Sequence, residues 1–269
     1  MKSKLFFTGL LMLACLCVQS SLFAQKTETR NVSNFSAIEA SSVFNITLNK
    51  SATESLVIEA DENIMPYVRT VVKNGVLKLY LDKNKNTNVK TLKATIGVKE
   101  LKKISLSGAC KLASNDVFEA PTFNIQLSGA CAIKLNVKTE KLKTDASGAC
   151  NLDLIVETQE AKFEASGASN LKLQLKAEKA VFDMSGAGKA EIKGKADKAE
   201  FGVSGACSVK AEDFACKIVS VESSGAGNLT LNVSERLEVD GSGTSNISYK
   251  GRPVINSNTS GMAKVRSID

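Results

Sequence analysis

The stretch Ser147-Gly148-Ala149-Cys150-Asn151-Leu152-Asp153-Leu154 is a motif that the chain repeats along most of its length. Its Ser-Gly pair recurs nine times, with the serine at Ser107, Ser128, Ser147, Ser166, Ser185, Ser204, Ser224, Ser242 and Ser260. Successive serines are 21, 19, 19, 19, 19, 20, 18 and 18 residues apart. Repetition at a nearly constant period of this length is typical of a solenoid, in which every repeat stacks on its neighbours.

Apolar and polar residues alternate on both sides of each Ser-Gly pair. In one repeat, residues 161–165 and 170–175 show this alternation, which is typical of strands with one buried face. The pattern therefore predicts a strand, a tight turn, a second strand and a looser turn in each repeat. A glycine that recurs at one turn position indicates a positive φ or very close packing there. The predicted turn glycines are Gly108, Gly129, Gly148, Gly167, Gly186, Gly205, Gly225, Gly243 and Gly261.

Two architectures have two strands per repeat, namely an antiparallel meander and a parallel β-helix. Small residues occupy the position three after each serine: Cys110, Cys131, Cys150, Ser169, Gly188, Cys207, Gly227, Ser245 and Ala263. A β-helix explains this column, because every copy would lie in the same cramped inner corner. The position six after the serine reads Lys134, Asp153, Lys172, Glu191 and Lys210, and such alternation of sign suits residues stacked about 4.8 Å apart. We therefore predict an all-β fold, a right-handed parallel β-helix of about 19-residue coils.

The chain divides into three predicted parts. Residues 1–24 have a basic start, an apolar run and Leu22-Phe23-Ala24 before Gln25, which together predict a cleaved signal peptide and no transmembrane segment afterwards. Residues 25–100 form an irregular β region with a degenerate first repeat, in which Ser42 stands where later copies have glycine. This region also contains a predicted hairpin at Asn74-Gly75. Residues 101–269 form the regular repeat array.

Composition limits the chemistry that the protein can perform. The chain has no His and no Trp, so it lacks imidazole for acid–base catalysis or metal ligation and indole for stacking on sugar rings. Its net charge of +7 is spread along the chain, so nucleic acid is not an expected partner. Five cysteines follow residue 24, and an odd number leaves at least one thiol outside intramolecular disulfides. Cys110, Cys131 and Cys150 could either form a disulfide between adjacent coils or act as small apolar fillers, and the second alternative is favoured.

One outward column is rich in acids. The position two before the serine reads Gln126, Asp145, Glu164, Asp183, Gly202, Glu222 and Asp240, with Glu39 at the matching place in the first copy. Asp145, Glu164, Asp183, Glu222 and Asp240 are the candidate binding residues, hereafter the acidic strip. Such a strip could hold Ca²⁺ or meet a basic or cation-bridged glycan surface. The alternative, a solvated face relieved by Lys143 and Lys162, is favoured, so no metal ligands and no cofactor are assigned.

The recurrent Ser-Gly-Ala-x-Asn-apolar-x-apolar motif, preceded by Phe35-x-x-Ile38-x-x-Ser41, resembles the family of auto-transporter adhesins with a head GIN domain. The resemblance covers residues 30–269 and implies export from Bacteroidetes-type bacteria. It also implies a right-handed β-helix similar in shape to pectate-lyase-like folds without their catalytic residues, and an adhesive role. It supplies no site residues. Ser41-Ser42, Thr244 and Met262 depart from the motif.

Together these features predict an exported, non-catalytic adhesin-like protein that presents a repetitive surface to cell-surface polysaccharide or protein. A periplasmic glycan- or partner-binding module is the alternative, and a polysaccharide-degrading enzyme is disfavoured because the acids form a uniform row. The location could be the periplasm, the outer surface or the extracellular space. A monomer is expected, because Lys264 and Arg266 discourage strand pairing at the last coil.

Overall fold

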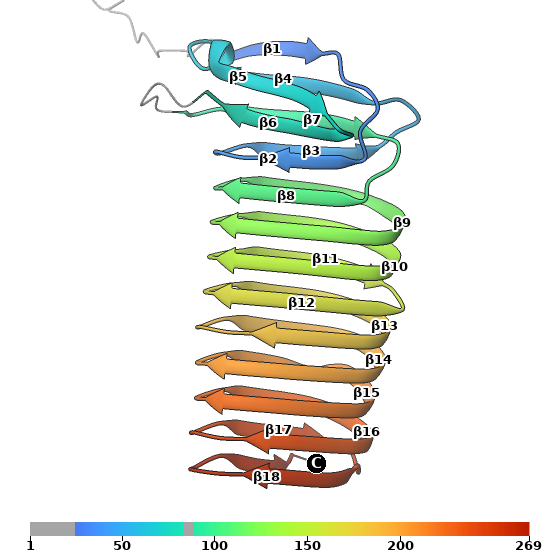
Figure 1. Ribbon diagram of the computed structural model, residues 1–269, viewed down its shortest axis with the longest axis vertical. Helices are drawn as coiled ribbons and strands as arrows, with labels where there is room; N and C mark the ends of the chain where they lie inside the picture. Colours follow the sequence, from blue (N-terminus) through green and yellow to red (C-terminus); the bar gives the residue numbers. More distant parts are fainter. Residues whose placement is uncertain (1–24, 83–88, 269) are drawn as a thin grey trace, which may run out of the picture.

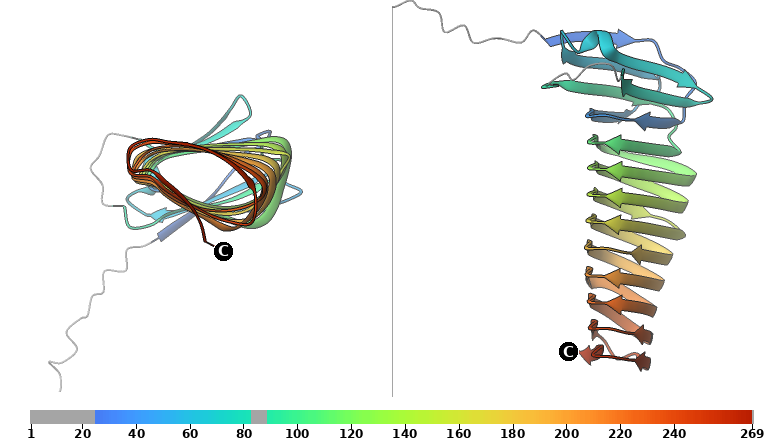
Figure 2. Two further views of the ribbon diagram at one scale, coloured as in Figure 1. Left: turned by 90° about the horizontal axis from the view of Figure 1, so that it is seen from below. Right: turned by 60° about the vertical axis from the view of Figure 1, so that its left-hand side comes forward.

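The computed structural model describes residues 25–82 and 89–268, so the predicted signal peptide, residues 1–24, lies outside the described residues. The described residues form a tall parallel β-helix with an N-terminal cap (Figure 1). The predicted fold class is therefore confirmed. Seen along its axis, the β-helix is flattened into two opposing sheets, which meet at a narrow corner and at a wider bend (Figure 2).

The coils stack in register, which places every Ser-Gly turn on the turn of the preceding coil. Ser147 pairs with Ser128 on one side and with Ser166 on the other, and all pairs in the array are parallel. The strands of the array are β8 (Lys103–Gly108), β9 (Lys111–Gly129), β10 (Ala132–Gly148), β11 (Asn151–Glu157), β12 (Glu160–Gly167), β13 (Asn170–Met184), β14 (Lys189–Gly205), β15 (Ser208–Gly225), β16 (Asn228–Gly241), β17 (Asn246–Lys250), β18 (Val254–Thr259) and β19 (Lys264–Ser267).

The wider bend differs from the looser turn that the sequence predicts. Strands such as β10 and β14 run from one Ser-Gly turn to the next without a break. Parallel hydrogen bonding to the coils above and below continues around the bend, so the backbone there needs no separate turn. Extra residues are absorbed as bulges. The longest repeat bulges between Ala113 and Val117, which pair with Lys134 and Asn136.

The Ser-Gly turn depends on its glycine for two reasons. Gly148 has a φ of 98°, in the left-handed region, and a Cβ at this position would lie 2.4 Å from the carbonyl oxygen of Gly129 in the preceding coil. That same oxygen accepts a hydrogen bond of 2.8 Å from the amide of Ala149. The turns therefore form a hydrogen-bonded backbone ladder with no room for a side chain at the glycine.

The core consists of side-chain columns that run along the axis. Phe163, Phe182 and Phe201 occupy the same position in successive coils and are buried. The Phe182 ring stacks on the other two at centroid distances of 5.2 and 4.9 Å. Phe214 meets Phe182 edge-on at 6.2 Å. Such aromatic pairs stabilise the fold beyond the burial of their area.

The N-terminal residues complete both sheets above the array. The strands are β1 (Gln25–Arg30), β2 (Ala37–Ala40), β3 (Asn45–Lys50), β4 (Ser55–Asp61), β5 (Val68–Lys73), β6 (Val76–Leu81) and β7 (Leu92–Val98), with a 3₁₀ turn at Met65–Tyr67. β2 and β3 form the first coil, parallel to β8 and β9. β6 and β7 return above that coil and add one parallel strand to each sheet. Antiparallel β5 then ends one sheet, and antiparallel β4 and β1 end the other.

Two turns in this cap match the sequence prediction. Asn74 and Gly75 both have positive φ, 53° and 74°, as a tight turn between β5 and β6 requires. Ser42 also has a positive φ, 88°, and its carbonyl accepts a hydrogen bond from the amide of Ala109. Ser42 thus takes the glycine position in the first coil.

Candidate functional site

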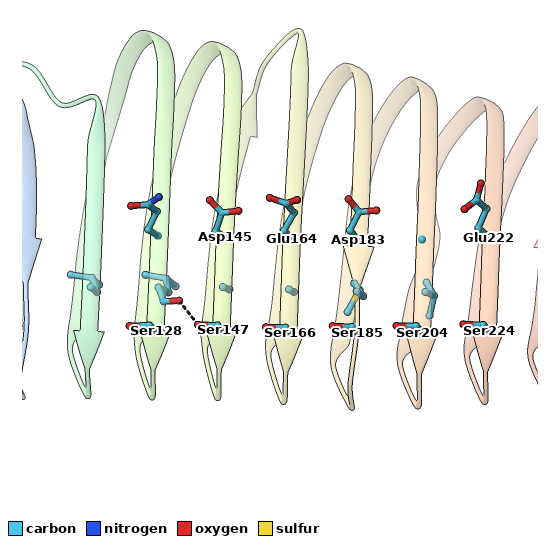
Figure 3. Close-up of a pocket in the computed structure, with 18 of the residues that line it drawn as sticks. Ser128, Asp145, Ser147, Glu164, Ser166, Asp183, Ser185, Ser204, Glu222 and Ser224 are labelled. Atoms are coloured by element: carbon cyan, nitrogen blue, oxygen red, sulfur yellow. Dashed lines mark hydrogen bonds between the residues drawn. The ribbon is translucent and has the colours of Figure 1, made fainter.

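The acidic strip is a straight row on one outer face of the β-helix. Strand register places Asp145, Glu164 and Asp183 on successive coils, and Glu222 and Asp240 follow after Gly202. Figure 3 shows the carboxylates of Asp145, Glu164 and Asp183 on neighbouring strands and that of Glu222 further along, with the serines of the Ser-Gly turns in a second row beside them. The two rows lie on the same face because they are two residues apart on one strand.

A groove of about 1170 Å³ follows these two rows. It extends from Glu39 in the first coil to Ser242, and each turn serine in between contributes a hydroxyl group. The serines labelled in Figure 3 are exposed, and apart from the Ser147 hydroxyl, which donates to the carbonyl of Leu127 at 3.5 Å, their hydroxyls are available to a ligand. We call the surface that carries this groove the groove face.

Lysines compensate the first half of the acidic strip. The ammonium of Lys143 lies 3.5 Å from Asp145 and 3.4 Å from Glu164. Lys162 lies 2.8 Å from Glu164 and 3.4 Å from Asp183. Each lysine bridges two coils. The lysine column beside the acidic strip therefore offsets part of the repulsion between its carboxylates.

Asp145 and Glu164 form a carboxyl pair. Partial burial raises the pKa of Asp145, and its hydrogen bond with Glu164 raises it further. The same hydrogen bond, followed by that of Lys162, lowers the pKa of Glu164 to about 2. A proton therefore resides on Asp145 in preference to Glu164 as the pH falls.

Asp145→Asn is expected to raise stability at pH 7 by about 0.5 kcal/mol, because it removes a partly buried charge that faces another carboxylate. The raised pKa of Asp145 means that the wild type loses stability as the pH rises through that pKa, so the advantage of the variant shrinks in acid. Urea unfolding at pH 7 and below pH 4 measures the difference. Glu164→Gln is the control of opposite sign: the lowered pKa of Glu164 predicts lower stability at pH 7 and a smaller loss in acid. Destabilisation by Asp145→Asn at pH 7 would contradict this account.

The second half of the strip is not compensated in this way. Ser220 and Glu238 take the positions that Lys143 and Lys162 occupy in earlier coils. Among residues 25–82 and 89–268, Glu222 and Asp240 have no side-chain hydrogen bond or ion pair. The exposed carboxylates at this end of the groove are therefore free to bind a cationic or hydroxylated ligand.

The carboxylates do not converge on a metal site. Within the described residues, no group of three or more Cys, Asp or Glu side chains could hold a metal ion. The strip supplies at most one carboxylate per coil, and in its first half lysine ammonium groups lie between the carboxylates. The geometry gives the Ca²⁺ interpretation no ligand set in the described part of the chain.

The small-residue column has a role that the sequence analysis missed. The thiols of Cys110, Cys131 and Cys150 are buried and each donates to the carbonyl of the serine three residues earlier, at 3.3 Å. Ser169 does the same through its hydroxyl at 3.2 Å. Burial raises the pKa of Cys110 to about 11, so its thiol stays protonated and remains a donor. The prevalence of Cys and Ser over Ala in this column was the available signal.

The cysteines of the described residues are all free thiols. Asparagines after the turns also bond to each other: Asn170 donates to Asn151 at 3.0 Å, and Asn246 donates to Asn228 at 3.2 Å and to the turn carbonyl of Thr244 at 3.5 Å. Side-chain amides thus pair between neighbouring coils, because the parallel register brings identical positions together.

The chain matches a known family model over residues 34–172 and 152–253, with the description "Putative auto-transporter adhesin, head GIN domain". No curated protein matches it. Among solved structures, a putative adhesin from Parabacteroides merdae is 22% identical, with a TM-score of 0.71 over 91% of this chain and 96% of that one. A putative lipid binding protein from Parabacteroides distasonis is 20% identical, with a TM-score of 0.68 over 91% and 97%. A putative adhesin from Bacteroides fragilis is 23% identical, with a TM-score of 0.57 over the same shares. At these identities the likeness shows a shared fold.

A membrane-spanning helix is not found in residues 25–82 and 89–268.

Proposed function

Because the chain belongs to the family described as "Putative auto-transporter adhesin, head GIN domain", we propose that it is an exported adhesin-like protein whose groove face binds polysaccharide or protein at a cell surface. Its role is contact, not catalysis. The acids of the groove face keep the same place in coil after coil, whereas active sites break the local pattern of a fold.

The observation that carries this proposal is the continuity of the groove. It crosses the coils from Glu39 to Ser242 with a hydroxyl row and a carboxylate row side by side. Hydroxyls both donate and accept hydrogen bonds, and carboxylates accept them, so the two rows together suit a hydroxyl-rich ligand. A repeated surface also suits a repeated ligand, because several weak contacts act together along one chain.

Binding of the purified protein to a glycan array and to intact cells tests the proposal. Glu222→Gln with Asp240→Asn removes the two uncompensated carboxylates without breaking an ion pair, and we expect it to reduce binding at least about tenfold, which corresponds to about 1.4 kcal/mol. The control is Asp153→Asn with Glu191→Gln, which removes two carboxylates from the opposite face and, with Glu191, one exposed ion pair to Lys193 at 3.5 Å. Equal binding by the groove variant and the wild type, or equal loss in both variants, would contradict the proposal.

A further inference from the structure

The groove face carries more acids than cations in the coils from Ser147 to Ser242. The positions four and two before the turn serine, in the coils from Ser147 to Ser242, hold seven carboxylates and two lysines. The carboxylates are Asp145, Glu164, Asp183, Glu200, Glu222, Glu238 and Asp240. The lysines are Lys143 and Lys162. The position six before the serine adds the acid Glu160 and four cations, Lys141, Lys179, Lys198 and Arg236, so the face keeps an excess of two negative charges.

The opposite sheet carries the opposite charge. The positions four and six after the turn serine hold seven cationic residues and only two acids, Asp153 and Glu191. The cationic residues are Lys111, Lys134, Lys172, Lys189, Lys210, Lys264 and Arg266. All seven are exposed, and the six lysines form no ion pair with any residue that the structure describes. We call this surface the basic face.

The two faces lie on opposite sides of one flattened blade (Figure 2). The coils that carry both faces repeat along the axis at about 4.8 Å. The basic face of one copy therefore offers the groove face of another a net charge of opposite sign at the same axial repeat.

We propose that the groove face binds the basic face of a second copy of this chain. This inference rests on the proposed function, since it names a partner for the same surface. The chain itself supplies a complementary surface of the right sign and the right repeat. The contact is heterologous, so each added copy exposes another groove face, and the copies form an open lateral array. Exposed charges dominate this contact, so the association of isolated molecules is weak and sensitive to salt. The prediction of a monomer rested on the absence of strand pairing at the last coil. The face-to-face contact proposed here does not involve strand pairing.

Sedimentation velocity on the purified protein measures this association. We expect the weight-average mass to rise with concentration at low ionic strength and to return to that of the monomer in about 1 M NaCl, where the Debye length is about 3 Å. Glu222→Lys with Asp240→Lys makes both faces basic. Lys111→Glu with Lys189→Glu leaves the groove face unchanged and removes most of the net positive charge of the basic face, at positions whose neighbours in the column are uncharged.

Each double variant alone should lose self-association, whereas an equimolar mixture of the two should regain it. This restoration separates face-to-face contact from a folding defect, and unchanged melting temperatures of the variants provide a second check. A wild type that stays monomeric at low ionic strength, together with a mixture that also stays monomeric, overturns the proposal. Binding of dextran sulfate to the basic face without self-association overturns it as well. If self-association is lacking but Glu222→Gln with Asp240→Asn still loses cell-surface binding, the partner is wrong and the proposed function stands.

Discussion

Gly148→Ala is expected to lower the free energy of unfolding by about 3 kcal/mol, and Gly167→Ala should do the same. Alanine must adopt a positive φ at either position, and its Cβ would lie 2.4 or 2.6 Å from a carbonyl oxygen of the coil before. That oxygen belongs to the backbone, which cannot move without breaking the hydrogen bond from the following alanine amide. Urea unfolding, followed by circular dichroism, measures the loss.

The hairpin glycine Gly75 provides the control. It has a φ of 74°, but a Cβ there would have no heavy atom within 4 Å. Gly75→Ala therefore isolates the cost of the positive φ, about 1 kcal/mol. Ser42 shows why the cost of a side chain in the turn depends on the preceding coil. Its φ is 88°, and it can carry a side chain because it lies in the first coil, where no Ser-Gly turn precedes it. Equal losses for Gly75→Ala and Gly148→Ala would show that coil contact adds nothing.

Phe182→Ala is expected to destabilise the fold by about 4 kcal/mol. Phe182 is fully buried and lies between two stacked rings, with a third ring at its edge. Alanine leaves a cavity in the middle of the column, and the surrounding strands cannot close it because their spacing is set by the parallel ladder. Thermal and urea unfolding measure the loss.

Two substitutions accompany this test. Val181→Ala changes the adjacent residue, which points outward on the same strand, and should cost well under 1 kcal/mol. Phe182→Leu keeps most of the volume and should cost less than Phe182→Ala. If Phe182→Ala costs no more than Val181→Ala, the ring column does not stabilise the coils.

The sequence predicted the array because its signals are local and repeated. The Ser-Gly period fixes the length of a coil, alternation fixes which residues of a strand point inward, and the small-residue column distinguishes a stacked β-helix from a meander. All of these hold in the structure: Ser147 stacks on Ser128, Phe163 on Phe182, and Asp145 aligns with Glu164. A fold in which each repeat meets a near-copy of itself leaves few pairings for tertiary contacts to choose.

The same locality explains what the sequence could not determine. No repeat encodes the return of β6 and β7 above the first coil, because those pairings join residues far apart in a stretch without a period. The bond of the Cys110 thiol depends on how close the turn brings it to the Ser107 carbonyl. The bridging of two coils by Lys143 depends on where side-chain tips meet across coils, not on which face they occupy. The sequence by itself thus determined the coil, its register and its inward columns, because these are set by backbone period and burial. The sequence also placed Lys143 and Lys162 beside the acidic strip. Only the tertiary structure decided the cap, the bridging of two coils by each of these lysines and the uncompensated charge at Glu222 and Asp240, because these depend on distances between residues of different coils.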